Sequence, residues 1–175
     1  SDVYKRQVNY IKITKHDIAN GSGIRVVLWI SGCTMFCKQC QNSSTWDFNA
    51  GKLFTENTKA ELLEVLEPEY ISGLTLSGGH PLELQNQNQV VDIVKTVKDK
   101  FPMKTIWLYT GYTYEEILKM PFVLKNIFPY IDVLVDGKYD YTKRDITLAW
   151  CGSSNQRVID VQESLKRDKV ILYKS

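Results

Sequence analysis

One continuous stretch decides how this chain folds and what it can bind: IRVVLWI at residues 24–30, followed by GCTMFCKQC at residues 32–40. The first segment is almost wholly apolar and rich in β-branched residues, which predicts a buried strand. The second places Cys33, Cys37 and Cys40 in C-x3-C-x2-C spacing directly after that strand. Three thiolates on one loop can hold three corners of an iron–sulfur cube and leave the fourth iron open to a substrate.

A structural zinc site is the main alternative for these cysteines, with Cys151 or His80 as a distant fourth ligand. Closed zinc sites usually draw their ligands in C-x2-C pairs from two separate knuckles. This chain instead offers three cysteines together and no second pair. Buried, inert cysteines are also disfavoured, because several residues of the loop are polar. The spacing therefore favours a cluster loop.

Composition predicts one compact domain. The chain has 175 residues and 43% hydrophobic content, and we expect a single domain over residues 8–175, with residues 1–7 interpreted as a non-native leader. A formal net charge of +2 gives no support for a nucleic-acid partner.

No apolar run is long enough to span a membrane, and no secretory signal is evident. Three crowded cysteines and a distant fourth make a poor disulfide framework, so we expect a soluble, cytoplasmic protein.

Strand-like and helix-like segments alternate along the chain. Strands are expected at residues 24–30, 73–77, 105–109 and 131–135, with shorter ones near Val158 and Val170. Helices are expected after a capping box at residues 58–61, over 88–100, after Thr113, and over 122–128. This order predicts an α/β fold with a mostly parallel sheet. Because a full eight-fold barrel needs about 250 residues, we expect an open, partial (β/α) barrel with ligands at the carboxyl ends of its strands.

Further motifs follow the cysteine loop in a recognisable order. A Gly-Gly-x-Pro turn occupies residues 78–81, after the next predicted strand. Six blocks accompany it: NGSGIR at 20–25, SSTW at 43–46, LTLSGG at 74–79, WLYTGY at 107–112, VDGKY at 135–139 and GSSNQR at 152–157. Together they cover most of the chain from Asn9 to Arg157. This set resembles the radical S-adenosylmethionine enzymes and, more narrowly, the family that activates anaerobic ribonucleoside-triphosphate reductase.

The resemblance implies a partial barrel of the radical S-adenosylmethionine type and a definite chemistry. Cys33, Cys37 and Cys40 would ligate one [4Fe–4S] cluster, whose fourth iron would be chelated by S-adenosylmethionine. Reductive cleavage would give a 5′-deoxyadenosyl radical, which would take a hydrogen atom from a glycine of the large reductase subunit and leave a glycyl radical there. A low-potential donor such as flavodoxin or ferredoxin would supply the electron, and a homodimer stays open as an assembly.

The resemblance also assigns residues around the cofactor. Gly78 and Gly79 would hold its ammonium group, because the missing Cβ atoms let backbone carbonyls approach closely; an ordinary turn is the alternative. Gln39, Cys40 and Gln41 would lie against the adenosine part. Many radical S-adenosylmethionine enzymes carry a hydrophobic residue at the position of Gln39, so adenine would here be packed more by backbone and amide contacts.

Four other residues need separate treatment. Lys138 could pair with the methionyl carboxylate, and Asp136 could hydrogen-bond the ribose or orient Lys138, although a turn with solvated charges explains both as well. His80 departs from the acidic residue that the related turn normally carries, and we interpret it as a solvated or locally hydrogen-bonded loop residue and not as a metal ligand. Cys151 stands where relatives tend to have arginine and is treated as a non-ligand.

Two other functions stay open on the sequence. The chain could activate a different glycyl-radical enzyme, such as a formate-lyase type, although the final GSSNQR block favours the reductase activator. A non-enzymatic metal-binding interaction module is the second alternative. A brown protein after anaerobic reconstitution with iron and sulfide would separate a cluster enzyme from a colourless zinc module.

Overall fold

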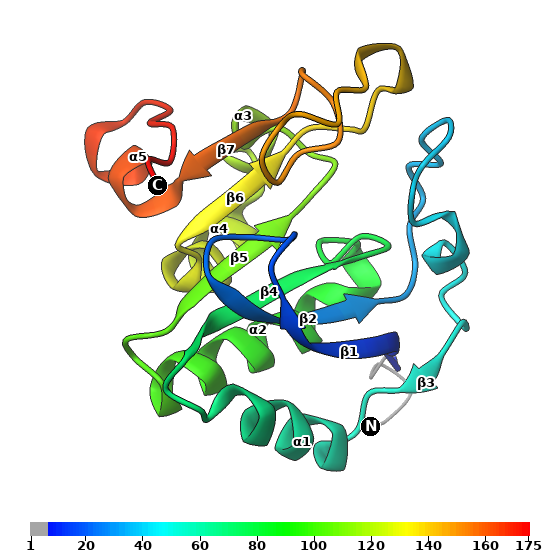
Figure 1. Ribbon diagram of the computed structural model, residues 1–175, viewed down its shortest axis with the longest axis vertical. Helices are drawn as coiled ribbons and strands as arrows, with labels where there is room; N and C mark the ends of the chain where they lie inside the picture. The colour runs from blue at the N-terminus through cyan, green and yellow to red at the C-terminus, as the bar shows by residue number, and fades with distance from the viewer. Residues whose placement is uncertain (1–6) are drawn as a thin grey trace.

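A computed structural model describes residues 7–175, so the leader proposed at residues 1–7 lies outside the described residues except for Gln7. A single seven-stranded sheet runs through the molecule in the order β3-β1-β2-β4-β5-β6-β7 and does not close on itself (Figure 1). Its strands are β1 Asn9–Asp17, β2 Ile24–Ile30, β3 Lys52–Leu53, β4 Ile71–Gly78, β5 Thr105–Tyr109, β6 Val133–Asp136 and β7 Arg157–Asp160.

The centre of the sheet is parallel and its edges are antiparallel. Strands β2, β4, β5 and β6 pair in parallel, as the alternation of strands and helices predicted. Strand β1 runs antiparallel to both β2 and β3, and β7 runs antiparallel to β6. The pairing of β1 with β2 follows from chain length, because residues 18–23 can connect a hairpin but cannot form the longer crossover that a parallel pair requires. The protein is therefore a mixed α/β fold with an open sheet.

Helices cover one face of this sheet, where Figure 1 shows α1, α2 and α4 side by side. The helices are α1 Glu56–Leu66, α2 Leu84–Lys100, α3 Tyr114–Ile117, α4 Pro121–Asn126 and α5 Val161–Arg167, with short 3-10 turns η2 Ser43–Thr45, η3 Phe128–Tyr130 and η4 Tyr141–Lys143. The capping box predicted at Thr113 is confirmed, with Glu116 as its partner. The box predicted to start at Thr58 is displaced, because Thr55 is the cap and Thr58 is its partner three residues later.

Other boundaries shift for similar local reasons. Helix α2 begins at Leu84, four residues before the predicted start, because its first turn is polar and lacks the apolar spacing that marked the rest. Strand β6 begins at Val133 because Ile131 still follows a 3-10 turn. The short strand near Val158 is confirmed as β7. The one near Val170 is only a single bridge between Ile159 and Leu172.

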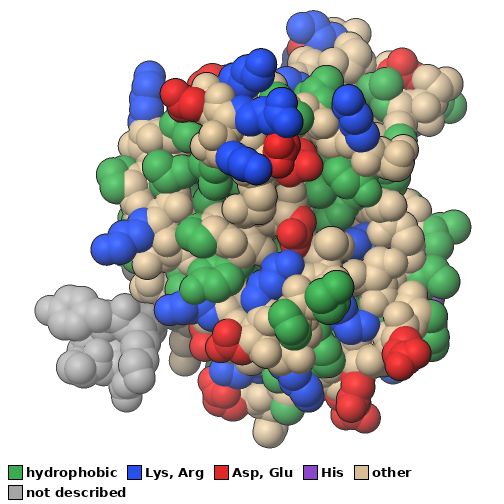
Figure 2. Space-filling view, turned by 90° about the vertical axis from the view of Figure 1, so that its left-hand side faces the viewer, with side chains coloured by type: hydrophobic (Ala, Val, Ile, Leu, Met, Phe, Trp, Pro, Cys, Tyr) green, Lys and Arg blue, Asp and Glu red, His purple; other side chains and the backbone are tan. Residues whose placement is uncertain are grey.

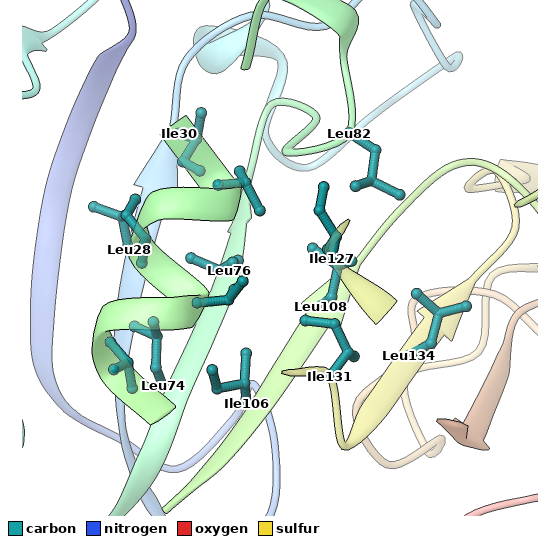
Figure 3. Close-up of a cluster of buried hydrophobic side chains, with 14 of the residues drawn as sticks. Leu28, Ile30, Leu74, Leu76, Leu82, Ile106, Leu108, Ile127, Ile131 and Leu134 are labelled. Carbon is teal, nitrogen blue, oxygen red and sulfur yellow. The ribbon is translucent and has the colours of Figure 1, made fainter. Parts of the chain in front are cut away.

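The main core lies between the sheet and its helices. Every second residue of the parallel strands points into it, as Figure 3 shows for Leu28, Leu74, Leu76, Ile106, Leu108 and Leu134. The intervening residues face the other side. There Trp107, Val133 and Val135 pack with Trp150 from a long loop and Tyr173 from the C-terminal segment. Because both faces of these strands are covered, most of their residues are buried, including polar ones such as Arg25, Thr75 and Asp136.

Arg25 fastens the central strands together from within the protein. Its side chain is 1% exposed, and its guanidinium donates to the hydroxyls of Thr75 and Thr105 and to the backbone carbonyls of Ser22, Leu74 and Thr105. All five of its N–H groups are therefore used. Burial lowers the pKa of Arg25 to about 10. Arg25 supports the sheet far from the strand ends where ligands collect.

The surface carries charges of both signs. Figure 2 shows lysine and arginine side chains interspersed with aspartate and glutamate over the face in view. Within residues 7–175, every helix is too short or too polar to traverse a lipid bilayer.

Candidate metal centre

The three loop cysteines lie around one cavity at the carboxyl ends of the parallel strands. The loop leaves β2, and Cys33, Cys37 and Cys40 line a cavity of about 120 Å³ together with Gly78 and Gly79 from the end of β4. Strand ends β5 and β6 complete the wall with Thr110, Gly111 and Gly137. The structure therefore brings the cysteines and the glycine turn together, although 38 to 46 residues separate Gly78 and Gly79 from the cysteines in sequence.

The thiols differ in their surroundings. Cys33 is buried, whereas Cys37 and Cys40 are half-buried. Burial raises the pKa of Cys33 and of Cys37, so the free side chains hold their protons and a bound metal would have to displace them. Between the cysteines, Phe36 and Gln39 have φ values of 49° and 53°. These left-handed conformations are uncommon outside glycine and concentrate in functional loops.

Backbone packing explains why two glycines follow β4. A Cβ on Gly78 would lie 2.6 Å from the backbone N and O of Ile30, and Gly78 also has a φ of 105°. A Cβ on Gly79 would lie 2.6 Å from the carbonyl oxygen of Gly32. The N–H of His80 then donates to that same Gly32 oxygen at 2.8 Å. The glycines thus let the turn lie directly on the start of the cysteine loop, which sequence reasoning had not anticipated.

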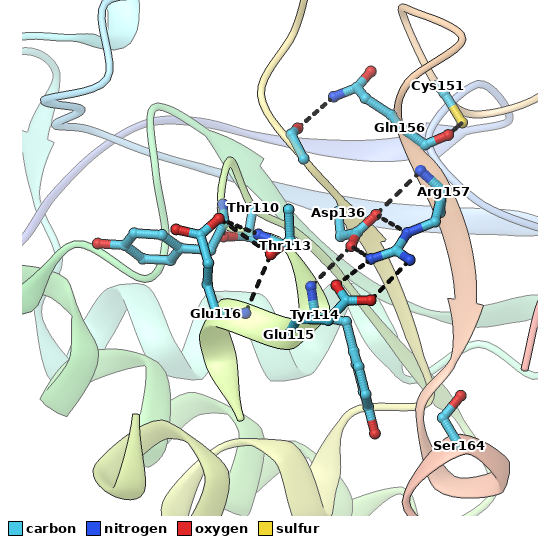
Figure 4. A network of polar contacts seen from close by, with 12 residues as sticks. Thr110, Thr113, Tyr114, Glu115, Glu116, Asp136, Cys151, Gln156, Arg157 and Ser164 are labelled. Carbon is cyan, nitrogen blue, oxygen red and sulfur yellow. Dashed lines mark hydrogen bonds and ion pairs between the residues drawn. The ribbon is translucent and has the colours of Figure 1, made fainter. Parts of the chain in front are cut away.

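Asp136 has different partners from those predicted (Figure 4). Its carboxylate is 1% exposed and accepts hydrogen bonds from the N–H of Tyr114 and from the backbone N–H, Nε and Nη2 of Arg157. These four contacts fill its acceptor sites. Arg157 also bonds both oxygens of Glu115. The structure therefore pairs Asp136 with Arg157 and leaves Lys138 without the orienting contact that was expected from it.

Lys138 is exposed and lies beside the cysteine loop. Its charge lowers the pKa of Cys37 against the larger, opposing effect of burial. It lines a neighbouring surface cavity together with Gly111 and Asn155, and the Asn155 side chain holds its backbone carbonyl at 2.8 Å. Gln156 fastens the preceding residue in the same way, by donating to the carbonyl oxygen of Gly137 at 2.9 Å. The end of the GSSNQR block therefore shapes the chain around Lys138.

A larger cavity of about 470 Å³ adjoins the cysteine cavity and shares Cys40, Asn42, Ser77, Tyr109, Tyr139 and Gln156 with it. Gln41 lines this larger cavity, and Cys151 lies in its wall. Gln39 is exposed, and in the described part of the chain, residues 7–175, it lines neither cavity. Burial raises the pKa of the Cys151 thiol.

Several residues around the cysteines carried no sequence signal. Met35 lines the cysteine cavity, and its sulfur occupies the space that a Cβ on Gly111 would fill. His80 is 1% exposed, so of its two predicted forms it is the locally hydrogen-bonded loop residue and not the solvated one. Both of its ring nitrogens are engaged, by Thr110 and by Glu83.

Over residues 7–175, the structure brings no three His, Cys, Asp or Glu side chains close enough together to hold one metal ion.

Comparison with known proteins agrees with this arrangement. Residues 19–159 match the family described as a 4Fe-4S single cluster domain. A protein of Enterobacteria phage T4 is 45% identical over 86% of this chain and 93% of its own length. A protein of Pasteurella multocida is 44% identical over 85% and 95%, and one of Escherichia coli strain K12 is 38% identical over 86% and 97%. Each is named anaerobic ribonucleoside-triphosphate reductase-activating protein.

These relatives are well above 30% identical, and the matched region contains the cysteine loop, the glycine turn and the strands that position them. The chain therefore belongs to the family of anaerobic ribonucleoside-triphosphate reductase-activating proteins, and its own sequence matches the 4Fe-4S single cluster domain.

Proposed function

We propose that this protein activates anaerobic ribonucleoside-triphosphate reductase by reductive cleavage of S-adenosylmethionine at a [4Fe–4S] cluster ligated by Cys33, Cys37 and Cys40. One observation carries the proposal: three thiols of one short loop line a single cavity at the strand ends, opposite a glycine backbone turn. His80 also lines this cavity, but both its nitrogens are hydrogen-bonded to protein. Cys151 lines the adjoining cavity. This donor set suits a cluster with one iron left open.

The residues present fit such a cluster chemically. Thiolates are the usual protein ligands of iron–sulfur clusters. The backbone N–H of Asn42 lies 3.4 Å from the Cys40 sulfur, in the geometry of the hydrogen bonds that tune cluster potentials. When bound, the cluster would supply the single electron for splitting the sulfonium of S-adenosylmethionine, the chemistry by which a glycyl radical would be formed on the reductase.

The chain's own residues bind and orient the cofactor in this proposal. Gly78 and Gly79 present backbone to its amino group, since no side chain stands between their main chain and the cavity. Lys138, exposed beside Cys37, is proposed to pair with its carboxylate. Gln41 lines the larger cavity next to Cys40, which supports a place for adenosine there.

Gln39 and Asp136 were both expected to contact the cofactor, and for each of them we now propose an indirect role. Gln39 is exposed at a left-handed backbone position, so we propose that it contributes through the shape of the loop and not by lining either cavity. Asp136 is saturated by Tyr114 and Arg157, so we propose that it acts indirectly, by fixing the strand end that carries Lys138. We propose that the open sheet, with these strand-end contacts, is a partial (β/α) barrel of the radical S-adenosylmethionine type.

The proposed target is the large glycyl-radical subunit of the reductase, with a low-potential donor such as flavodoxin or ferredoxin as reductant. The names of the relatives favour this target over a formate-lyase type enzyme. The family description favours a cluster over a structural zinc module.

Electron paramagnetic resonance tests the proposal. The reconstituted protein, reduced anaerobically with S-adenosylmethionine and the reductase, should produce a glycyl radical signal on the reductase. Cys37→Ala should abolish the signal, because it removes one of the three proposed ligands. Cys151→Ala is the matched control and should keep it. A glycyl radical that persists in Cys37→Ala, or failure of the wild-type protein to cleave S-adenosylmethionine, would refute the assignment.

A further inference from the structure

We propose that His80 and Glu83 form a positioning pair, which locks the cysteine loop to the glycine turn and to the end of β5. The inference deepens the proposed function, because it rests on Cys33 as a cluster ligand. Both side chains are almost fully buried, with His80 1% and Glu83 7% exposed. Neither residue has a part in the cofactor contacts described above.

Glu83 is the contact to the cysteine loop. Its Oε1 accepts hydrogen bonds from the backbone N–H of Thr34 at 2.7 Å and from the Thr34 hydroxyl at 2.8 Å. Thr34 directly follows Cys33, so these two bonds restrain the loop one residue from a proposed ligand. Burial would raise the pKa of Glu83, but the hydrogen bonds from His80 and Thr34 outweigh it and leave the pKa lowered. Glu83 therefore holds Thr34 as a charged carboxylate.

His80 orients that carboxylate, and its hydrogen-bond partners define its tautomer. The N–H of Gly111 points at Nε2 at 3.4 Å, so Nε2 is an acceptor. Because Nε2 is an acceptor, the Thr110 hydroxyl 2.7 Å away donates its hydrogen there, while its oxygen accepts from the N–H of Tyr112. The remaining proton is on Nδ1, which lies 3.3 Å from Glu83 Oε1 and donates to it.

This chain of bonds joins three segments that are distant in sequence. It runs from the end of β5 through the turn after β4 to the cysteine loop after β2. Glu83 is also the N-cap residue of α2, a helix of 17 residues, which makes it a rigid support. In the same helical turn, the Asn86 amide donates to the carbonyl oxygens of Ser31 and His80. The start of α2 therefore holds the chain on both sides of Gly32 and Cys33.

A positioning pair of this kind has two separable consequences. The hydrogen bonds restrain Thr34, and the negative charge of Glu83 acts on a cluster held by the loop, since its Oε1 lies 2.7 Å from the backbone nitrogen of the residue after Cys33. A negative charge near a cluster stabilises its oxidised form and lowers its reduction potential. Glu83→Leu removes both effects, whereas Glu83→Gln keeps an acceptor for Thr34 and removes only the charge.

The test uses the full chain, before and after anaerobic reconstitution, in four forms: wild type, Glu83→Leu, Glu83→Gln and the control Asn88→Leu at an exposed position of α2. Before reconstitution, hydrogen exchange at the Thr34 amide should speed up about tenfold or more in Glu83→Leu. It should stay near wild type in Glu83→Gln and Asn88→Leu. After reconstitution, iron loss to a chelator should be faster in Glu83→Leu, and the cluster's midpoint potential should rise in Glu83→Gln.

A second pair of variants examines His80 itself. His80→Asn keeps an N–H donor close to the position of Nδ1 and should preserve Thr34 protection, whereas His80→Leu should lose it. Unchanged Thr34 exchange in Glu83→Leu would overturn the proposal, as would an unshifted potential in Glu83→Gln. Because the exchange measurement needs no cluster, it tests the pairing of His80 and Glu83 even if the wild-type protein takes up no iron. Failure of the wild-type protein to take up iron would instead refute the proposed function.

Discussion

Asp136→Ala should destabilise the fold through its ion pair with Arg157. The carboxylate is 1% exposed and accepts four hydrogen bonds, three from Arg157 and one from the N–H of Tyr114. Removing the carboxylate leaves its buried N–H donors unpaired, which costs about 2–4 kcal/mol; the cost is lower than for a fully buried ion pair, because the Arg157 side chain is 34% exposed and keeps its bonds to Glu115. Domains of this size are stable by roughly 5–15 kcal/mol. The variant should therefore lose a large share of its stability and about 4–16 °C in Tm.

Urea unfolding of the full chain, followed by circular dichroism, measures this loss. The matched control is Asp99→Ala, which removes an exposed carboxylate from α2 and should leave the unfolding midpoint nearly unchanged. A double-mutant cycle with Arg157→Ala should return a coupling energy of about 1–3 kcal/mol between the two side chains. A direct ribose contact makes the opposite prediction. If Asp136→Ala kept its stability and lost affinity for S-adenosylmethionine, the structural role assigned to Asp136 would be wrong.

Three further predictions concern the same framework. Arg25→Lys should lower the free energy of unfolding in urea by about 2–4 kcal/mol, because an ammonium offers three donors where the guanidinium uses five. An unchanged unfolding midpoint would contradict the role of Arg25 between the strands. Gly78→Ala should destabilise more than Gly137→Ala by the same assay. Both have positive φ, but a Cβ at Gly78 meets Ile30 backbone at 2.6 Å and one at Gly137 has 3.7 Å of space; equal losses would refute the packing argument. The hydrogen bond from Arg157 lowers the pKa of Glu115 below its ordinary 4.5, so this group stabilises the fold above pH 4.5 and loses its contribution as pH falls through the lowered value. Glu115→Gln should reduce the acid dependence of the unfolding midpoint, and an unaltered acid limb would count against the pair.

Local sequence patterns were enough to place the cysteine cavity within the fold. The apolar run before Cys33, the strand before Gly78 and the strand at residues 105–109 each have unambiguous signals of their own. Once three such strands are parallel, their carboxyl ends must meet at one edge. The cavity formed by the cysteines and the glycine turn follows from that rule, even though no local pattern links the two segments.

Contacts between distant side chains could not be predicted in the same way. Glu83 and Thr34 are 49 residues apart, and Arg157 and Asp136 are 21 apart. A carboxylate at a strand end looks the same in sequence whether it faces a ligand or an arginine. For Glu83 a weak signal existed, since the i, i+3 spacing from His80 across a Pro-containing turn brings two side chains to one side. The antiparallel edges were missed because β1 was not identified as a strand, and because the connection from β6 to β7, residues 137–156, is long enough to permit either direction of pairing.

Mössbauer spectroscopy of the iron-reconstituted protein, recorded with and without S-adenosylmethionine, shows whether one iron of the cluster lacks a protein ligand. Cys33, Cys37 and Cys40 provide three thiolates around one cavity, so we expect a [4Fe–4S] cluster with one iron whose spectrum changes when the cofactor is added, while the others stay as they were. A cluster in which every iron keeps its spectrum, or a single metal ion with four protein ligands, would contradict this expectation.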